Sequence, residues 1–305
     1  MNESDAEEDI EKFAGTIGDA MAYVANEAIL LARMEEFFSP KPARLWAESE
    51  EDYFTKKLDK AVENMGGPPR LILMKTDEPP PQCDTYPEAV LREVITAFQR
   101  ARKSVCRAHM FMIGAKMQRE HPDWLGLTPD NDNLLKFHEI SEGAFWEHAE
   151  TAYIRLASYW DRVGQVLDFA FFKIRQFERD GFAAVADRIR TNVIQMNTNL
   201  GSSGSWKAIR AYQTSEKDDG LKWLLRRRNI TVHSLHLRAV DKTTDEVAFS
   251  PMYNHLEEKL NARLAPRSPL DEVEQLHVHL SKAATLFREI LNVVEYAHHL
   301  YKSDA

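Results

Sequence analysis

An all-α fold is predicted by three features of the sequence. Apolar residues recur at spacings of three and four through most of the 305 residues, which is the period of an α-helix. Proline and glycine gather in a few short segments that separate these periodic stretches. Only residues 71–74 and 238–252 are compatible with a short extended segment. We therefore expect an antiparallel helical bundle with an additional N-terminal helical region.

The expected helices follow one another with clear breaks between them. They cover residues 8–37, 50–65, 87–119, 141–179, 182–196, 206–237 and 269–301. The first carries one apolar stripe, which consists of Ile10, Phe13, Ile17, Met21, Val24 and Ile29. Residues 197–205, with the sequence NTNLGSSGS, are expected to form a flexible loop, and Asp218-Asp219-Gly220 is expected to interrupt the helix over 206–237.

Two regions are expected along the chain. The strongest break runs from Gly66 to Pro81, with five prolines and two glycines in sixteen residues. Residues 131–305 are predicted to form the bundle, and residues 1–130 a helical region of unknown role that packs on the bundle or extends from it. No internal repeat is present.

The charge is distributed unevenly. The net charge is −9, which argues against a protein that coats nucleic acid with its whole surface. Six acids lie within residues 3–11, whereas residues 205–238 carry eight Lys and Arg against three acids. The basic segment is compatible with one local anion site or with an ordinary solvated helix face.

The sequence also indicates the cellular compartment and whether a metal or cofactor is expected. The two cysteines, Cys83 and Cys106, form no disulfide or metal-binding pattern, and no secretory signal or membrane-spanning run is visible. We expect a cytoplasmic protein without membrane contact. His277 and His279 point about 200° apart on a helix and cannot share an ion there, so no metal and no cofactor is expected.

One segment, residues 221–233, combines residue types that suit phosphodiester chemistry. Arg228 supplies a permanent charge and a donor fork that fits phosphate oxygens. His233 titrates near neutrality and can act as acid or base, and Asn229, four residues before it, can position the ribose or the imidazole. With the ribose 2′-hydroxyl as nucleophile, such a group needs no metal and acts on RNA alone. An Arg and a His five residues apart are nevertheless common in proteins.

At these residues the sequence resembles the HEPN superfamily (higher eukaryotes and prokaryotes nucleotide-binding domain). Its signature is an Arg, usually followed by a polar residue, and then a His after four to six residues on a late helix of a bundle. Arg228, Asn229 and His233 match it in type and order. The segment 159–165 also resembles an early helix of some bacterial members, and the resemblance covers about residues 141–300. It implies a metal-independent endoribonuclease, often a toxin or antiviral defence effector, whose composite cleft is formed by a homodimer.

Within this hypothesis Arg228, Asn229 and His233 are the expected catalytic residues. Lys222, Arg226, Arg227 and His236 are the expected RNA-binding residues, although each also fits an ordinary surface position. The expected partners are RNA, a second copy of the chain and an antitoxin or another defence protein. Some members of the superfamily keep the motif without cleaving RNA. A non-catalytic helical module that binds RNA, a nucleotide or a protein is therefore the alternative.

Overall fold

The computed structural model describes residues 3–66, 85–125, 132–175, 181–195, 198–233 and 268–302. Within these ranges every regular element is helical and no strand occurs, which confirms the predicted all-α class. The chain divides into two compact units, residues 1–41 and residues 42–305. The first unit consists of α1 (Glu3–Phe37) and the few residues after it.

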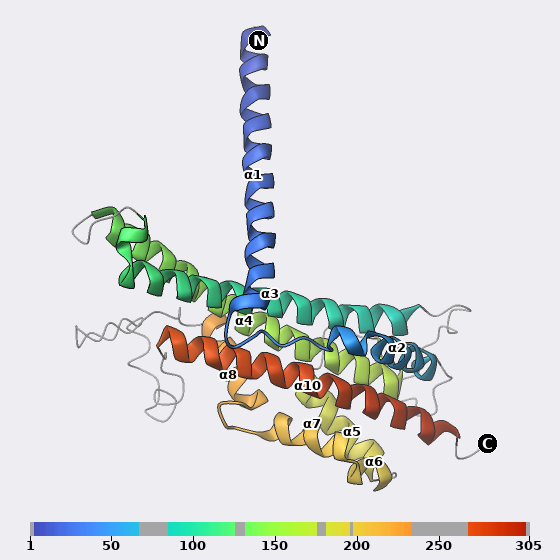
Figure 1. Ribbon diagram of the computed structural model, residues 1–305. Coiled ribbons are helices and arrows are strands. Elements are labelled where there is room, and N and C mark those ends of the chain that lie inside the picture. The colour runs from blue at the N-terminus through green and yellow to red at the C-terminus, as the bar shows by residue number, and fades with distance from the viewer. Residues whose placement is uncertain are drawn as a thin grey trace. The chain divides into compact units, whose positions relative to one another are not determined.

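Three long helices form the centre of the second unit. These are α3 (Tyr86–Glu120), α4 (Asp132–Phe172) and α10 (Pro269–Lys302). Helices α3 and α4 run antiparallel, because Arg155 donates to Ser104 whereas Ser141, earlier in α4, donates to Gln118, later in α3. Helix α10 packs against both, and Figure 1 shows it lying along them.

Shorter helices cover this centre. Helix α2 (Glu51–Met65) packs on α10 and α3, while α5 (Phe182–Ile189) and α8 (Leu221–His233) pack on α4. Helix α7 (Gly204–Thr214) contacts α10 and α8, and α6 (Thr198–Ser202) precedes it. Because α4 is covered on several sides, it is apolar around much of its circumference. Its fully buried side chains include Phe145, Tyr153, Tyr159, Trp160 and Phe169.

The approach of α5 to α4 depends on a glycine. A Cβ atom at Gly164 would lie 2.9 Å from the Cα atom of Phe182, closer than such atoms approach in proteins. Glycine therefore lets the first turn of α5 rest directly on the α4 backbone, with Phe182 beside Trp160 at a ring-centroid distance of 4.9 Å.

Most of the predicted helix boundaries agree with the structure to within two residues. The helix predicted over 141–179 differs: α4 begins at Asp132 and ends at Phe172, where Lys173 has a φ of 56°. That left-handed residue stops the helix. The helix predicted over 182–196 changes after Ile189 into a π-helical turn, Arg190–Ile194.

The loop predicted over 197–205 is partly wrong. It contains α6, and Ser203 then caps α7 by accepting a hydrogen bond from the backbone N–H of Trp206. The predicted interruption at residues 218–220 is confirmed, since it separates α7 from α8. The possible extended segments at 71–74 and 238–252 lie outside the described residues.

The second compact unit extends across residue 130, where the sequence analysis placed its boundary. Helices α2 and α3 precede that residue and belong to the same unit as α4 and α10. The two compact units divide between Lys41 and Pro42.

Candidate functional site

Helix α8 has one side in the core and one side facing solvent. Leu221, Trp223, Leu224 and Arg227 are buried, whereas Lys222 and Asn229 are exposed. With 3.6 residues per turn, positions 222, 226, 229 and 233 fall on the same, outward side of the helix. The backbone of His233 ends α8, but its side chain and the whole of His236 lie outside what the structure describes.

The prediction that Arg227 binds RNA needs correction. Its side chain is 0% exposed and forms an ion pair with the equally buried Glu272 of α10. The guanidinium also lies over the rings of Trp223 and Tyr153, at 5.6 Å and 5.7 Å from their centroids. Such a charge is held by its partner and by the flat faces of two aromatic rings. Arg227 therefore fixes α8 to the core and does not face a phosphate.

Arg228 lies on the side of α8 that faces α4. It is half-buried and interacts electrostatically with Asp161 of α4. Burial raises the pKa of the Asp161 carboxyl, while Arg228, Arg162 and a hydrogen bond from the backbone N–H of Phe182 act in the opposite direction. The carboxylate of Asp161 thus joins α8, α4 and the first turn of α5.

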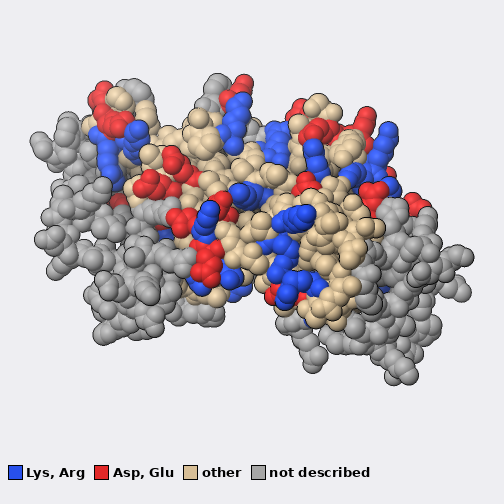
Figure 2. Space-filling model, turned by 90° about the horizontal axis from the view of Figure 1, so that it is seen from below, with Lys and Arg blue, Asp and Glu red and all other residues tan. Residues whose placement is uncertain are grey.

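The outward side of α8 carries two cations that share one acid. The ammonium of Lys222 lies 3.2 Å from Glu216, and the guanidinium of Arg226 lies 3.8 Å from the other carboxylate oxygen of the same residue. All three side chains are well exposed, so these ion pairs are weak. Figure 2 shows that Lys and Arg side chains on the face seen from below are interspersed with Asp and Glu, and do not form one uniform basic surface.

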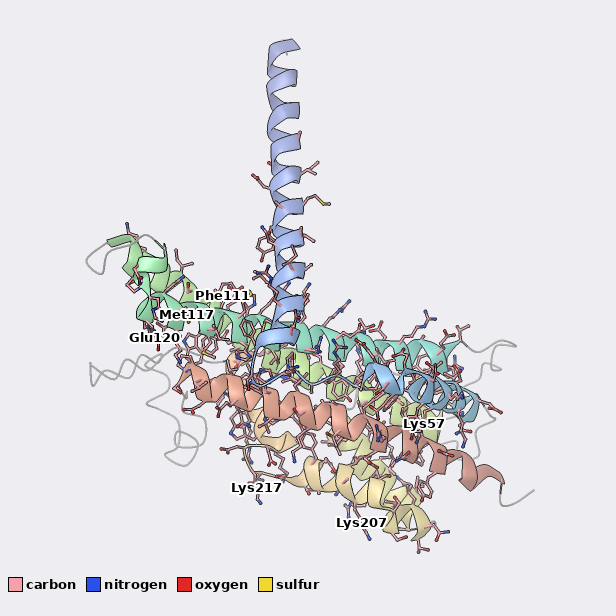
Figure 3. All side chains as sticks on the ribbon, in the orientation of Figure 1. Lys57, Phe111, Met117, Glu120, Lys207 and Lys217 are labelled. Atoms are coloured by element: carbon pink, nitrogen blue, oxygen red, sulfur yellow. The ribbon has the colours of Figure 1, made fainter. Side chains whose placement is uncertain are left out.

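The neighbouring helix α7 adds further cations on its outer side. Lys207 on α7 and Lys217 in the following turn are exposed and point away from the core in Figure 3. Arg210 is instead held 2.7 Å from Asp187. The exposed cations nearest in sequence to the candidate site are thus Lys217, Lys222 and Arg226.

The two histidines of α10 lie in different surroundings. Nε2 of His277 lies 3.1 Å from Nδ1 of His109 on α3, whereas His279 stacks on Trp223 of α8 with ring centroids 5.4 Å apart. Burial lowers the pKa of each of these two histidines to about 4. They do not share a ligand position, and no cluster of three or more metal-ligating side chains occurs among the described residues.

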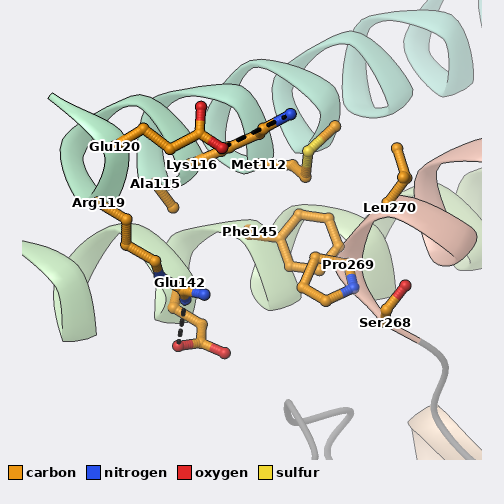
Figure 4. Close-up of a pocket in the computed structure, with 10 residues that line it drawn as sticks. All are labelled: Met112, Ala115, Lys116, Arg119, Glu120, Glu142, Phe145, Ser268, Pro269 and Leu270. Carbon is orange, nitrogen blue, oxygen red and sulfur yellow. Dashed lines mark ion pairs between the residues drawn. The ribbon is translucent and has the colours of Figure 1, made fainter.

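A pocket of about 280 Å³ lies away from α8, where α3, α4 and the start of α10 meet (Figure 4). Its inner wall is apolar, with Met112, Phe145 and Leu270, and its rim carries the Arg119–Glu142 ion pair at 3.7 Å. No residue of α8 lines it. The pocket therefore adds nothing to the predicted RNA site.

Two acids that shape the site were missed by the sequence analysis. Glu272 is spaced four, seven and eleven residues from Leu276, His279 and Ala283, all of which are buried on α10. A lone charge on such an apolar face predicts a buried partner of opposite charge. Glu216 gives no comparable signal, because it lies in the turn between two helices.

Comparison of the chain with protein-family models, with curated proteins and with solved structures found no match. No helix of the described residues is long and apolar enough to cross a membrane.

Proposed function

We propose that the protein is a metal-independent endoribonuclease of the HEPN type and that α8 is its catalytic helix. The observation that supports the proposal best is the division of α8 into two sides. Trp223, Leu224 and Arg227 hold one side in the core, so the positions of Asn229 and His233 face outward at the C-terminal end of the helix. Lys222 and Arg226 extend the same outward side and can contact the phosphates of a bound strand.

The reaction would be an attack by the ribose 2′-hydroxyl on the adjacent phosphorus. His233 takes or returns the proton, Asn229 orients the ribose or the imidazole, and Arg228 stabilises the charge on the phosphorane. The bond from phosphorus to the 5′-oxygen breaks, so that the products are a 2′,3′-cyclic phosphate and a free 5′-hydroxyl. The reaction uses no metal and does not apply to DNA, which lacks the 2′-hydroxyl.

The placement of Arg228 fits a cleft shared between two copies. On a regular helix Arg228 and His233 are separated by roughly 140°, and Arg228 lies toward Asp161 on α4. One copy alone therefore presents these two groups in different directions. A two-fold axis that sets two α8 helices side by side can supply the missing group from the partner.

The decisive experiment is a cleavage assay with EDTA present. Purified protein is incubated with mixed RNAs beside His233→Ala, Arg228→Ala and the matched control His121→Ala, which lies at the end of α3. We expect chelator-resistant cleavage by the wild type and by the control, with at least a hundredfold loss in the other two variants. Circular dichroism must show an unchanged fold for all four proteins. Equal inactivity of the wild type and the His233 variant would reject the proposal.

A non-catalytic module that binds RNA or a protein is the second candidate. The charges around α8 favour it, because Lys222 and Arg226 share Glu216 and Arg228 lies beside Asp161. RNA binding without cleavage would support this candidate.

A role as a toxin or antiviral effector in the cytoplasm, with an antitoxin as partner, belongs to the first candidate. Expression of the protein with the products of its neighbouring genes would test this role.

A further inference from the structure

Helix α1 has a continuous apolar stripe with the period of a coiled coil. Counting from residue 14, the stripe residues are separated by steps of three and four, and they are Ala14, Ile17, Met21, Val24, Ala28 and Leu31. Ile10 extends the same pattern by one further position. The average step of 3.5 residues is the heptad repeat, in which these residues occupy the alternating a and d positions.

One position of the heptad is polar throughout α1. Lys12, Asp19, Asn26 and Arg33 are spaced by seven residues and lie at the position farthest from the stripe. The positions that flank the stripe are mostly small, as at Gly18, Ala20, Ala25 and Ala32. Small flanking residues let a second helix approach closely. Charged side chains at most of these positions would keep it at a distance.

The described residues of its own compact unit do not cover the stripe. That unit contains α1, the two residues before it and the four residues after it. The exposed fractions of Ile17, Met21 and Val24 are 49%, 66% and 58%, which is high for large apolar side chains on one side of a helix. In addition, Gly15 and Gly18 each weaken an isolated helix by about 0.5–1 kcal/mol. Helix α1 thus gains stability from a partner along its length.

We propose that α1 pairs with α1 of a second copy of this chain as an antiparallel coiled coil. In an antiparallel pair an a residue faces a d residue of the other helix. This places Ala14 opposite Leu31 and Ile17 opposite Ala28, so that a small side chain faces a large one in these layers, and it places Met21 opposite Val24. In a parallel pair Ala14 would face Ala14 and Ala28 would face Ala28, which leaves space at both layers.

The charge of the first helical turns supports the same orientation. Six acids lie between Glu3 and Glu11, and a parallel pair would bring twelve of them together at one end. An antiparallel pair separates the two acidic segments by the length of the helix. The same acids disfavour an anionic membrane or a nucleic acid as the partner of α1. The pairing is independent of the nuclease proposal, which concerns the second unit.

Disulfide mapping tests the pairing and its direction together. In the full chain, with Cys83→Ser, the variants Ala14→Cys and Leu31→Cys are combined and oxidised gently. We expect one dominant species of twice 35.1 kDa in which residue 14 of one copy is joined to residue 31 of the other. Links of 14 to 14 and 31 to 31 would overturn the antiparallel arrangement, and absence of a dimeric product would overturn the pairing itself.

A matched pair of charge variants separates α1 from other contacts between copies. Ile17→Glu with Val24→Glu places two charges in the stripe and should reduce the cross-link at least tenfold. Tyr23→Glu with Asn26→Glu adds the same charge outside the stripe and should leave it unchanged. An equal effect of both pairs would overturn the proposal. RNA cleavage is measured on the same proteins, so loss of the cross-link and loss of nuclease activity are distinguished.

Discussion

Arg227 of α8 and Glu272 of α10 form a completely buried ion pair, and Tyr153 of α4 donates a hydrogen bond of 2.5 Å to the second carboxylate oxygen. Three helices thus meet at one carboxylate. The stack of Trp223 on His279 lies next to this pair and joins α8 to α10 a second time. The orientation of the candidate catalytic helix depends on these contacts.

Removing one partner of the buried pair should therefore destabilise the fold strongly. Glu272→Ala leaves an uncompensated guanidinium in the core, and we expect the free energy of unfolding to fall by about 3–5 kcal/mol. Urea denaturation followed by circular dichroism measures this loss.

Two further variants show whether the loss of stability is specific to the buried ion pair. Glu216→Gln breaks only exposed ion pairs and should cost less than about 1 kcal/mol. Arg227→Met combined with Glu272→Gln removes both charges and should recover most of the stability lost in Glu272→Ala. A smaller loss for Glu272→Ala than for Glu216→Gln would contradict the structural role of the pair.

The helical pattern was predictable because apolar periodicity depends on local sequence alone. The bounds of α2, α3 and α10 follow from this signal, as does the interruption before α8. The end of α4 did not follow from it, because a non-glycine residue, Lys173, adopts the left-handed conformation there. Lys173 also donates a hydrogen bond to the carbonyl of Met65, a contact across 108 residues that no local pattern reveals.

The candidate site was predictable in residue type but not in burial. Four arginine and lysine side chains between 222 and 228 look alike in the sequence, yet they differ in the structure. Arg227 is buried, Arg228 faces α4, and Lys222 and Arg226 face solvent. The burial of Arg227 depends on Glu272, which lies on another helix. The spacing of residues within α8 does not reveal this partner.

RNA binding should depend on Lys222 and Arg226 and be opposed by Glu216. Replacing both cations by Gln should weaken binding for all sequences and lower the slope of log affinity against log salt by about 1–2. Glu216→Gln should strengthen binding, because it releases both cations from their shared acid. Titration of a labelled single strand at several salt concentrations measures both effects.

The control for this prediction lies on α7. Lys207→Gln removes an exposed cation from another helix and should change the affinity much less than the Lys222 and Arg226 replacements. Weaker binding by Glu216→Gln than by the wild type would count against RNA contact at the outward side of α8.

Acid should destabilise the protein through the buried histidines. The pKa of His277 and of His279 is lowered by burial from 6.5 to about 4. The unfolded chain therefore binds more protons than the folded chain between pH 6.5 and pH 4. The neutral rings make their full contribution to the free energy of unfolding above pH 6.5. This contribution is lost as the pH falls from 6.5 to 4, at about 1.4 kcal/mol per pH unit for each histidine.

Single replacements test this pH dependence. His279→Gln removes one of the titrating groups and should reduce the slope of unfolding free energy against pH between 4 and 6.5 by about 1.4 kcal/mol per unit. Urea denaturation at several pH values gives both slopes, and identical slopes in the wild type and His279→Gln would refute the assignment.

The contact between Arg228 and Asp161 should be visible as a change in the titration of that carboxyl. Burial already raises the pKa of Asp161, and the positive charge of Arg228 acts against this shift. Arg228→Gln removes the charge, so the pKa of Asp161 should rise further. Carbon-13 NMR of the aspartate carboxyl groups, with Asp161→Asn to assign the signal, measures the shift. Arg226→Gln serves as the control, because Arg226 lies near Glu216 instead. If the Asp161 signal titrates at the same pH in wild type and Arg228→Gln, Arg228 does not face α4 and is free to point with Asn229 toward solvent.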